Sequence, residues 1–155
     1  MKLIQHHING KKISSGNRKG NIFNPAIGEV IANVELGDSK LVSDAVKVAL
    51  NAFEEWQYTT PAKRASIMFK YKSLLEENAE NIAELVSVEH GKTIEDAKGS
   101  LQRGIEVVEF ACSIPNLLKG EFSNQVGNGI DTFSMKQPLG VCAGITPFNF
   151  PVMIP

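Results

Sequence analysis

Near its end, the 155-residue chain reads Leu139-Gly140-Val141-Cys142-Ala143-Gly144-Ile145-Thr146-Pro147-Phe148-Asn149-Phe150-Pro151. Small and β-branched apolar residues run without interruption from Val141 to Ile145, a pattern typical of a strand buried on both faces of a parallel sheet. The two prolines that follow fix their own φ angles and push the residues before them towards extended conformations. The sequence therefore predicts a buried strand that ends in a stiff loop carrying one neutral amide donor, Asn149.

Asn149 is the strongest candidate for chemistry in the chain. A stiff loop can hold a side-chain amide in place towards a developing oxyanion, and such a donor is commonly worth about 3 kcal/mol of barrier. The alternative is that Asn149 only serves the turn between Pro147 and Pro151. The residues alone favour neither interpretation.

The composition is typical of a soluble globular domain, with 43% hydrophobic residues, 21% charged residues and a net charge of -1. This charge gives no electrostatic reason to expect nucleic acid or an anionic membrane as a partner. Cys112 and Cys142 lie among apolar neighbours without a C-x-x-C pair, which favours a reducing compartment and buried, inert thiols. The N-terminus lacks the features of a targeting signal and no apolar run could span a bilayer, so we expect a cytoplasmic protein.

The first 36 residues predict two β-hairpins. The Asn9-Gly10 pair is a preferred centre of a type I′ turn, and a second turn is expected at 24–29, before the strand-like residues 30–34. Because an isolated hairpin is only marginally stable in water, this arm is expected to pack on a larger body.

Four helices are expected next, each with an apolar stripe of helical period. Ser39 is the predicted N-cap of the first helix, the Thr60-Pro61 pair opens the second, and Thr93 opens the fourth. Gly91 is the expected C-terminal stop of the third helix, and Pro115 ends or kinks the fourth. The residues predicted to face the core are Val42, Ala45, Val46, Ala49, Leu50 and Phe53, then Ile67, Tyr71, Leu74 and Leu75, then Ile82, Leu85 and Val86, and finally Ala97, Leu101, Ile105, Val108 and Cys112.

Alternating apolar and polar residues at 130–137 predict a half-exposed strand. No metal site is expected, because His6 and His7 are neighbours in a strand and point to opposite faces, and because no metal-ligand pattern such as HExxH occurs. No glycine-rich phosphate loop is found either. Lys92 is interpreted as a solvated surface charge and Arg103 as a helix-packing or interface residue, with no functional role assigned to either.

Several motifs, in the right order, resemble the aldehyde dehydrogenase superfamily, and the whole chain is similar to roughly the N-terminal third of its members. The motifs are Asn24-Pro25-Ala26-Ile27-Gly28-Glu29-Val30-Ile31, Glu89-His90-Gly91-Lys92-Thr93 and Pro147-Phe148-Asn149-Phe150-Pro151. The segments 104–112 and 138–145, with Phe rather than Trp at position 148, look like the CoA-acylating methylmalonate-semialdehyde dehydrogenase branch.

The resemblance implies an α/β fold in which residues 1–155 are an incomplete aldehyde dehydrogenase domain. Its parts would be a β-hairpin arm at 1–36, a four-helix segment of the NAD-binding domain at 38–120, and an oligomerisation strand segment at 121–138. Residues 139–155 would be the first strand of the Rossmann-like NAD-binding domain and the oxyanion loop. A homo-oligomer, dimer or tetramer, is implied for a full-length protein.

The resemblance also implies an NAD-dependent reaction with coenzyme A as co-substrate. Methylmalonate semialdehyde or malonate semialdehyde would be oxidised with loss of CO2 to propionyl-CoA or acetyl-CoA. Asn149 would be the catalytic oxyanion donor, and the NAD pocket would be lined, largely through the backbone, by Ile145, Thr146, Pro147 and Phe148. Such a placement agrees with the rule that dinucleotides bind outside the carboxyl ends of strands in open α/β sheets.

By the same resemblance, the nucleophilic cysteine and the general-base glutamate would lie beyond Pro155. We therefore expect the 155-residue chain alone to be inactive and poorly folded, as a truncated product or an incomplete sequence, because an acyl-enzyme needs a nucleophile. Residues 141–145 would lack neighbouring strands and expose apolar surface. The alternatives are another NAD(P)-dependent aldehyde or succinate-semialdehyde dehydrogenase, with water as acyl acceptor, and a catalytically dead module that packs on a full-length paralogue.

Overall fold

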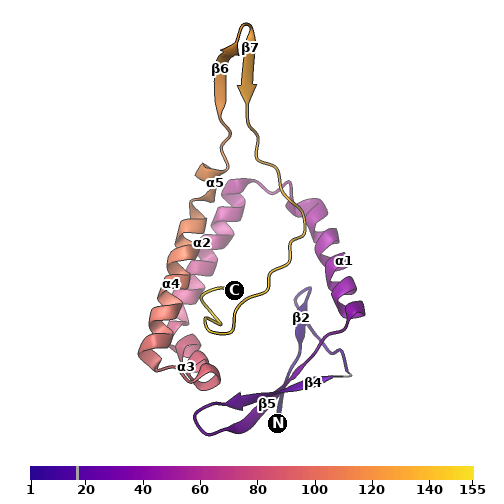
Figure 1. Ribbon diagram of the computed structural model, residues 1–155, viewed down its shortest axis with the longest axis vertical. Helices are drawn as coiled ribbons and strands as arrows, with labels where there is room; N and C mark the ends of the chain where they lie inside the picture. The colour runs from indigo at the N-terminus through magenta and orange to yellow at the C-terminus, as the bar shows by residue number, and fades with distance from the viewer. Residues whose placement is uncertain (17) are drawn as a thin grey trace.

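The computed structural model describes residues 1–16 and 18–155. In chain order its elements are β1 (Lys2–Ile4), β2 (His6–Ile8), β3 (Lys11–Ile13), β4 (Lys19–Asn24), β5 (Glu29–Glu35), α1 (Ser39–Trp56), α2 (Pro61–Glu77), α3 (Ala79–His90), α4 (Ile94–Cys112), α5 (Ile114–Leu117), β6 (Phe122–Gly127) and β7 (Ile130–Phe133). Figure 1 shows α1 on one side and the α2–α4 pair on the other, with the N-terminal strands at one end and the β6–β7 hairpin projecting from the other.

The N-terminal arm contains a three-stranded sheet and a separate hairpin. In the sheet, β5 pairs in parallel with β1 and antiparallel with β4. The hairpin joins β2 and β3 through Asn9 and Gly10, whose φ angles of 52° and 71° suit a type I′ turn. Both predicted hairpins are confirmed, whereas the parallel pairing of β1 with β5 was not predicted.

Glu35 at the end of β5 connects the two parts of the arm, and it is only 3% exposed. The Ser14 hydroxyl donates to its Oε1 at 2.6 Å, and the backbone N–H of Ser15 donates to its Oε2 at 2.7 Å. The hydrogen bond from Ser14 holds the pKa of the Glu35 carboxyl below its usual value, with help from Ser15, against the opposing effect of burial. A buried carboxylate thus links the segment after β3 to β5.

The core lies where α3 and α4 meet. Ala83 and Val86 of α3 pack with Ala97 of α4, and Val152 from the C-terminal segment packs against this cluster. The buried face of α4 then continues through Leu101, Ile105 and Cys112, as predicted. The predicted caps Thr60 and Thr93 and the left-handed Gly91 at the end of α3 are likewise confirmed.

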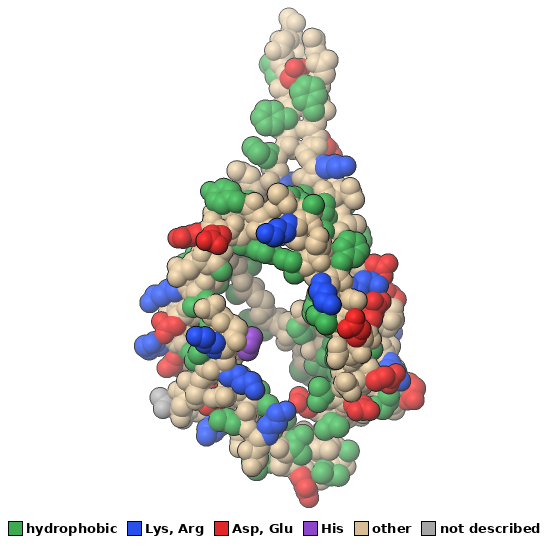
Figure 2. Space-filling model, turned by 180° about the vertical axis from the view of Figure 1, so that it is seen from behind, with side chains coloured by type: hydrophobic (Ala, Val, Ile, Leu, Met, Phe, Trp, Pro, Cys, Tyr) green, Lys and Arg blue, Asp and Glu red, His purple; other side chains and the backbone are tan. Residues whose placement is uncertain are grey.

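The apolar stripe of α1 and most of that of α2 remain open to solvent. Among the residues that the structure describes, α1 has none that is buried, and Val42, Val46 and Leu50 are 42–61% exposed. The chain has 11628 Å² of accessible surface, against roughly 7,700 Å² for a compact monomer of this mass. Figure 2 shows openings between α1 and the other helices. Both helices form as predicted, but the prediction that their stripes face a core is wrong for α1. In α2, Leu75 is half-buried, whereas Ile67, Tyr71 and Leu74 are 42–49% exposed.

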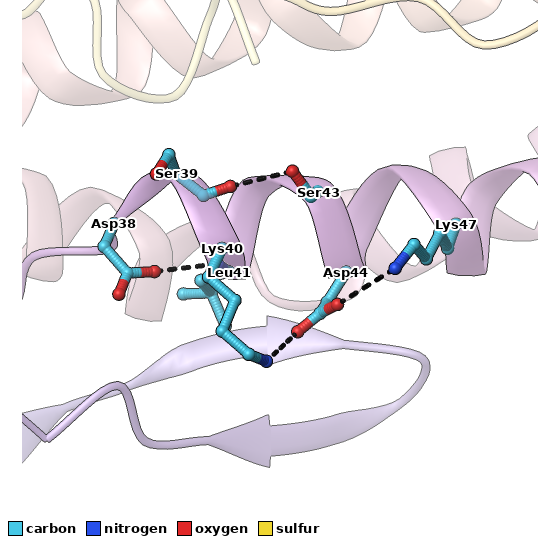
Figure 3. Close-up of polar contacts among 7 residues, drawn as sticks. All are labelled: Asp38, Ser39, Lys40, Leu41, Ser43, Asp44 and Lys47. Atoms are coloured by element: carbon cyan, nitrogen blue, oxygen red, sulfur yellow. Dashed lines mark hydrogen bonds and ion pairs between the residues drawn. The ribbon is translucent and has the colours of Figure 1, made fainter.

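The N-cap of α1 is Asp38, so the prediction of Ser39 is wrong. The Asp38 carboxylate accepts the backbone N–H of Leu41 at 2.8 Å from an extended backbone (Figure 3). Ser39 is instead the first helical residue, and its carbonyl accepts the hydroxyl of Ser43 at 2.9 Å. Asp and Ser are about equally good caps, and the two residues are adjacent here, so the local sequence could not separate them.

Two exposed ion pairs follow this cap on the surface of α1. Lys40 donates to Asp44 at 2.7 Å, and Lys47 pairs with the same carboxylate at 3.7 Å (Figure 3). The hydrogen bond from Lys40 lowers the pKa of Asp44. All three side chains are exposed, so these ion pairs contribute little to stability.

The two strands predicted near the C-terminus have different outcomes. The strand expected at 130–137 forms in part, because β7 ends at Phe133 and pairs antiparallel with β6 in an exposed hairpin. The buried strand expected at 141–145 does not form in this chain. A parallel strand needs neighbours for its N–H and C=O groups, and the described residues place none beside it. The expected exposure of apolar surface here is confirmed, since Val141 and Ile145 are exposed.

Candidate functional site

The loop at 146–151 lies against the junction of α3 and α4. In Figure 1 the C-terminal segment runs down between the two helical sides of the molecule and ends beside these helices. The chain turns at Phe148 and Asn149 and again from Pro151 to Met153. The prolines thus bracket a turn, as the sequence predicts, although no strand leads into it.

Lys92 holds the loop to the helices. Its Nζ donates to the backbone carbonyl of Asn149 at 3.0 Å and to the hydroxyl of Ser100 at 3.3 Å. The same ammonium lies 4.7 Å from the centre of the Phe150 ring, within the range of a cation–π contact. The interpretation of Lys92 as a solvated surface charge is therefore wrong. Its partners lie 8 and 57 residues away in the sequence, so no local pattern could reveal them.

The backbone of Lys92 is fixed on both sides. Gly91 ends α3 with a left-handed φ of 82°, and Thr93 caps α4 by accepting the backbone N–H of Asp96 at 3.2 Å. The Ser87 hydroxyl donates to the carbonyl of Lys92 at 2.8 Å. Because Lys92 lies between two helix ends, its side chain leaves the junction in a defined direction.

Two further contacts hold the residues after the loop. Val152 packs against the hydrophobic cluster of α3 and α4. Met153 passes close to Gly104 on α4, where an added Cβ would lie 3.2 Å from the Met153 Cα. The segment is therefore attached at three places: the ammonium of Lys92, the hydrophobic cluster and the surface of α4 at Gly104.

Asn149 is exposed, and the hydrogen bond from Lys92 uses its backbone carbonyl rather than its side-chain amide. The four residues predicted to bind the cofactor are also exposed, and they are Ile145 (101%), Thr146, Pro147 and Phe148 (89%). All five predicted site residues thus lie on one uncovered stretch. A ligand could reach both the backbone and the apolar side chains of this stretch.

Two cavities flank the loop. One of about 220 Å³ is bounded by Phe150 together with Lys92 and Arg103. The other, of about 510 Å³, is bounded by Phe148 and His90. The aromatic rings on either side of Asn149 therefore line different cavities. Arg103 is an exposed cavity-lining residue on α4 rather than one packed between helices.

The two cysteines differ. Cys112 is buried on α4 as predicted, whereas Cys142 is exposed and the prediction of its burial is wrong, because the strand that would bury it does not form. Within residues 1–16 and 18–155, no three His, Cys, Asp or Glu side chains gather in a group that could hold a metal ion. None of the helices in this same part of the chain is long and apolar enough to cross a membrane.

Comparison with known proteins identifies the family of the chain. Residues 12–155 match the aldehyde dehydrogenase family. The chain is 51% identical over 155 residues to the malonate-semialdehyde dehydrogenase of Pseudomonas aeruginosa, a match that covers all of this chain and 31% of that protein. The chain thus spans about a third of the length of the curated relatives that it matches.

Solved structures give the same result. The crystal structure of methylmalonate-semialdehyde dehydrogenase from Oceanimonas doudoroffii matches with a TM-score of 0.95 and 52% identity, over 99% of this chain and 32% of that one. A homologue from Sinorhizobium meliloti 1021, solved in complex with NAD, matches with a TM-score of 0.94 and 48% identity over the same shares. The predicted α/β fold is confirmed, and the chain belongs to the aldehyde dehydrogenase family.

Proposed function

We propose that this chain supplies the oxyanion part of an aldehyde dehydrogenase site that oxidises malonate-type semialdehydes. In that site the side-chain amide of Asn149 donates to the carbonyl oxygen of the aldehyde as nucleophilic attack gives that oxygen a negative charge. The observation that carries the proposal is the hydrogen bond of 3.0 Å that fixes the backbone of Asn149 to Lys92. A donor whose backbone is already held needs little reorganisation, which is the condition for effective oxyanion stabilisation.

We assign NAD to the stretch that precedes Asn149. Residues 145–148 offer exposed backbone groups and the apolar surfaces of Ile145 and Phe148, which suit a dinucleotide lying across this part of the fold. The NAD complex of the Sinorhizobium meliloti homologue supports NAD as the cofactor. Bound NAD would supply the hydride acceptor, and the residues of this chain would bind and orient it beside Asn149.

We assign a semialdehyde that carries a carboxylate as the substrate, and coenzyme A as the acyl acceptor. The malonate-semialdehyde and methylmalonate-semialdehyde dehydrogenases among the relatives support this substrate class. The oxidised acyl group would lose CO2 and leave as acetyl-CoA or propionyl-CoA. Cys112 is buried in α4, and the thiol of the exposed Cys142 contacts the carbonyl of Gly140 at 3.7 Å. We therefore expect neither thiol to act as the nucleophile and the 155-residue chain alone to have no turnover.

We assign the β6–β7 hairpin, within the segment 121–138, to contacts between subunits of a homodimer or tetramer. Phe122, Val126, Ile130 and Phe133 are 56–76% exposed, and apolar side chains line the projecting hairpin in Figure 2. A two-stranded hairpin with such a surface is at best marginally stable in water by itself. We assign the segment 38–120 to the NAD-binding domain. The exposed apolar residues of α1 and α2 in this segment are likewise expected to pack against another surface in the complete enzyme.

A hybrid enzyme tests the proposal. Residues 1–155 replace the aligned third of the Pseudomonas aeruginosa malonate-semialdehyde dehydrogenase, and NADH formation is followed with malonate semialdehyde, with and without coenzyme A. We expect CoA-dependent activity that Asn149→Ala lowers by about 10²- to 10³-fold in kcat. Asn51→Ala, at an exposed position of α1 outside its apolar stripe, is the matched control and should leave kcat unchanged.

Two results would contradict parts of this proposal separately. Full activity in the Asn149→Ala hybrid would remove the oxyanion role of Asn149. Formation of the free acid at the same rate with or without coenzyme A would remove the acyl-transfer assignment and leave a dehydrogenase that uses water as acyl acceptor.

A further inference from the structure

The Lys92 side chain contacts both the loop that carries Asn149 and the helix α4. We propose that Lys92 is a positioning residue for the oxyanion loop, because its ammonium holds the Asn149 carbonyl, the Phe150 ring and the Ser100 hydroxyl at one point. This inference rests on the proposed function, since it gives Lys92 an effect on the direction of the Asn149 amide. Lys92 itself touches neither substrate nor cofactor in this role.

The two loop contacts constrain consecutive residues. The carbonyl of Asn149 belongs to the peptide unit that joins it to Phe150, so the hydrogen bond from Lys92 fixes the orientation of that peptide plane. The ammonium over the ring then fixes the side chain on the far side of the same peptide. A charge-assisted hydrogen bond is stronger than a neutral one, and the ammonium is in addition attracted to the face of the aromatic ring. Together they leave the backbone of Asn149 little freedom to turn its amide elsewhere.

Ser100 fixes the other end of this arrangement. It is a buried residue of α4, and its hydroxyl lies 3.3 Å from the Lys92 Nζ. An ammonium has three N–H donors, and the structure offers it three partners: a carbonyl, a hydroxyl and an aromatic face. The loop is therefore joined to α4 through the ammonium, and a neutral side chain of the same length could not replace all three contacts.

Lys92 is also the attachment nearest to Asn149. The other two attachments, at Val152 and at Met153 against Gly104, both follow Pro151. On the N-terminal side, residues 141–145 form no strand in this structure and are exposed. Removal of the ammonium would therefore free residues 146–150 while the segment that follows them stayed in place.

Backbone NMR relaxation in the 155-residue chain tests the contact directly. Lys92→Met keeps the length of the side chain but removes its charge and donors, and it should lower the N–H order parameters of Thr146, Phe148, Asn149 and Phe150 from about 0.85, typical of rigid backbone, to below about 0.6. Lys92→Arg should restore part of this order. The matched control is Lys98→Met, because Lys98 lies on α4 but pairs with Glu80 at 2.7 Å instead of the loop. Equal order parameters at these four residues in the Lys92→Met and Lys98→Met chains would overturn the inference.

Kinetics in the hybrid enzyme test the effect on Asn149. We expect Lys92→Met to lower kcat about tenfold or more, with the KM for malonate semialdehyde changed less than about twofold, because a small misplacement of a catalytic group slows chemistry more than binding. If Lys92 acts only through Asn149, then Lys92→Met should cause no further loss of kcat in the Asn149→Ala background. Lys92→Arg should recover most of kcat.

The double-mutant cycle distinguishes a failure of the positioning role of Lys92 from a failure of the proposed function of Asn149. A loss of kcat from Lys92→Met that multiplies with the loss from Asn149→Ala would overturn the positioning role and leave the function of Asn149 intact. An Asn149→Ala hybrid with unchanged kcat would overturn the proposed function, and the positioning role would fall with it.

Discussion

The ammonium of Lys92 donates to the backbone carbonyl of Asn149 at 3.0 Å, although the two residues lie 57 positions apart in the sequence. Gly91 and Thr93 fix the helix junction from which Lys92 extends. The loop docks on this junction even though no strand forms in the preceding residues 141–145. In this chain the helices, and not a sheet, therefore determine where the candidate oxyanion donor lies.

Substitutions at the start of α1 should distinguish the two candidate caps. Asp38→Ala removes the acceptor for the Leu41 N–H and should lower the free energy of unfolding by about 1 kcal/mol. Ser39→Ala should change it by no more than a few tenths of a kcal/mol, because Ser39 lies within the helix, where Ala is a better helix former. Urea unfolding followed by circular dichroism measures both. Equal losses in the two variants would contradict Asp38 as the cap.

Two glycines of α4 should respond differently to alanine. A Cβ at Gly99 would meet nothing within 4 Å, whereas one at Gly104 would lie 3.2 Å from the Met153 Cα. Gly99→Ala should raise the free energy of unfolding by up to about 1 kcal/mol through helix propensity. Gly104→Ala should give a smaller gain or a loss, since Met153 must move. If urea unfolding showed the same gain for both, Met153 would not rest on α4.

The stability of the N-terminal arm should depend on pH through Glu35. Its pKa is lower in the folded chain than the usual value of 4.5, chiefly because Ser14 donates to it. A carboxyl with a lowered pKa stabilises the folded state above its unfolded pKa, and this contribution is lost as pH falls through the folded pKa. The melting temperature should therefore fall as the pH drops below about 4.5, and the fall should be smaller in Glu35→Gln. Glu29→Gln, at the exposed end of the same strand, is the control, and a pH profile of Glu35→Gln identical to that of the parent chain would contradict the account.

The β6–β7 hairpin should determine the number of subunits in the hybrid enzyme. Phe122 and Phe133 lie directly opposite each other across the two strands, and Ser123 faces Thr132 at the next pair. Successive strand residues point to opposite faces, so one face carries the aromatic pair and the other the hydroxyl pair. Phe133→Glu should shift the enzyme to a smaller species in sedimentation, whereas Thr132→Glu should not. An unchanged sedimentation coefficient in Phe133→Glu would exclude the aromatic face from the subunit contact.

Local signals predicted much of the fold because each depends on only a few neighbouring residues. The Asn9-Gly10 turn, the cap at Thr93 and the stop at Gly91 are of this kind. The parallel pairing of β1 with β5 and the contact between Lys92 and Asn149 could not be predicted, because each joins residues whose proximity exists only after folding.

Burial predictions failed where a partner surface was required. The apolar stripe of α1 has the right period, and residues 141–145 have the pattern of a buried strand, yet both remain exposed in the described residues. A hydrophobic pattern indicates which face of a helix or strand is apolar, but it does not identify the surface that buries this face. The candidate site illustrates the same limit, since Asn149 was identifiable from its two flanking prolines and Lys92 was not.

The most direct test of the central claim is the rate of the NADH burst in a single turnover of the hybrid enzyme, measured by rapid mixing with malonate semialdehyde. If Asn149 is the oxyanion donor, then Asn149→Ala should slow this burst by about 10²- to 10³-fold. A burst rate within about twofold of the parent hybrid, well below the effect of losing one such donor, would contradict the claim.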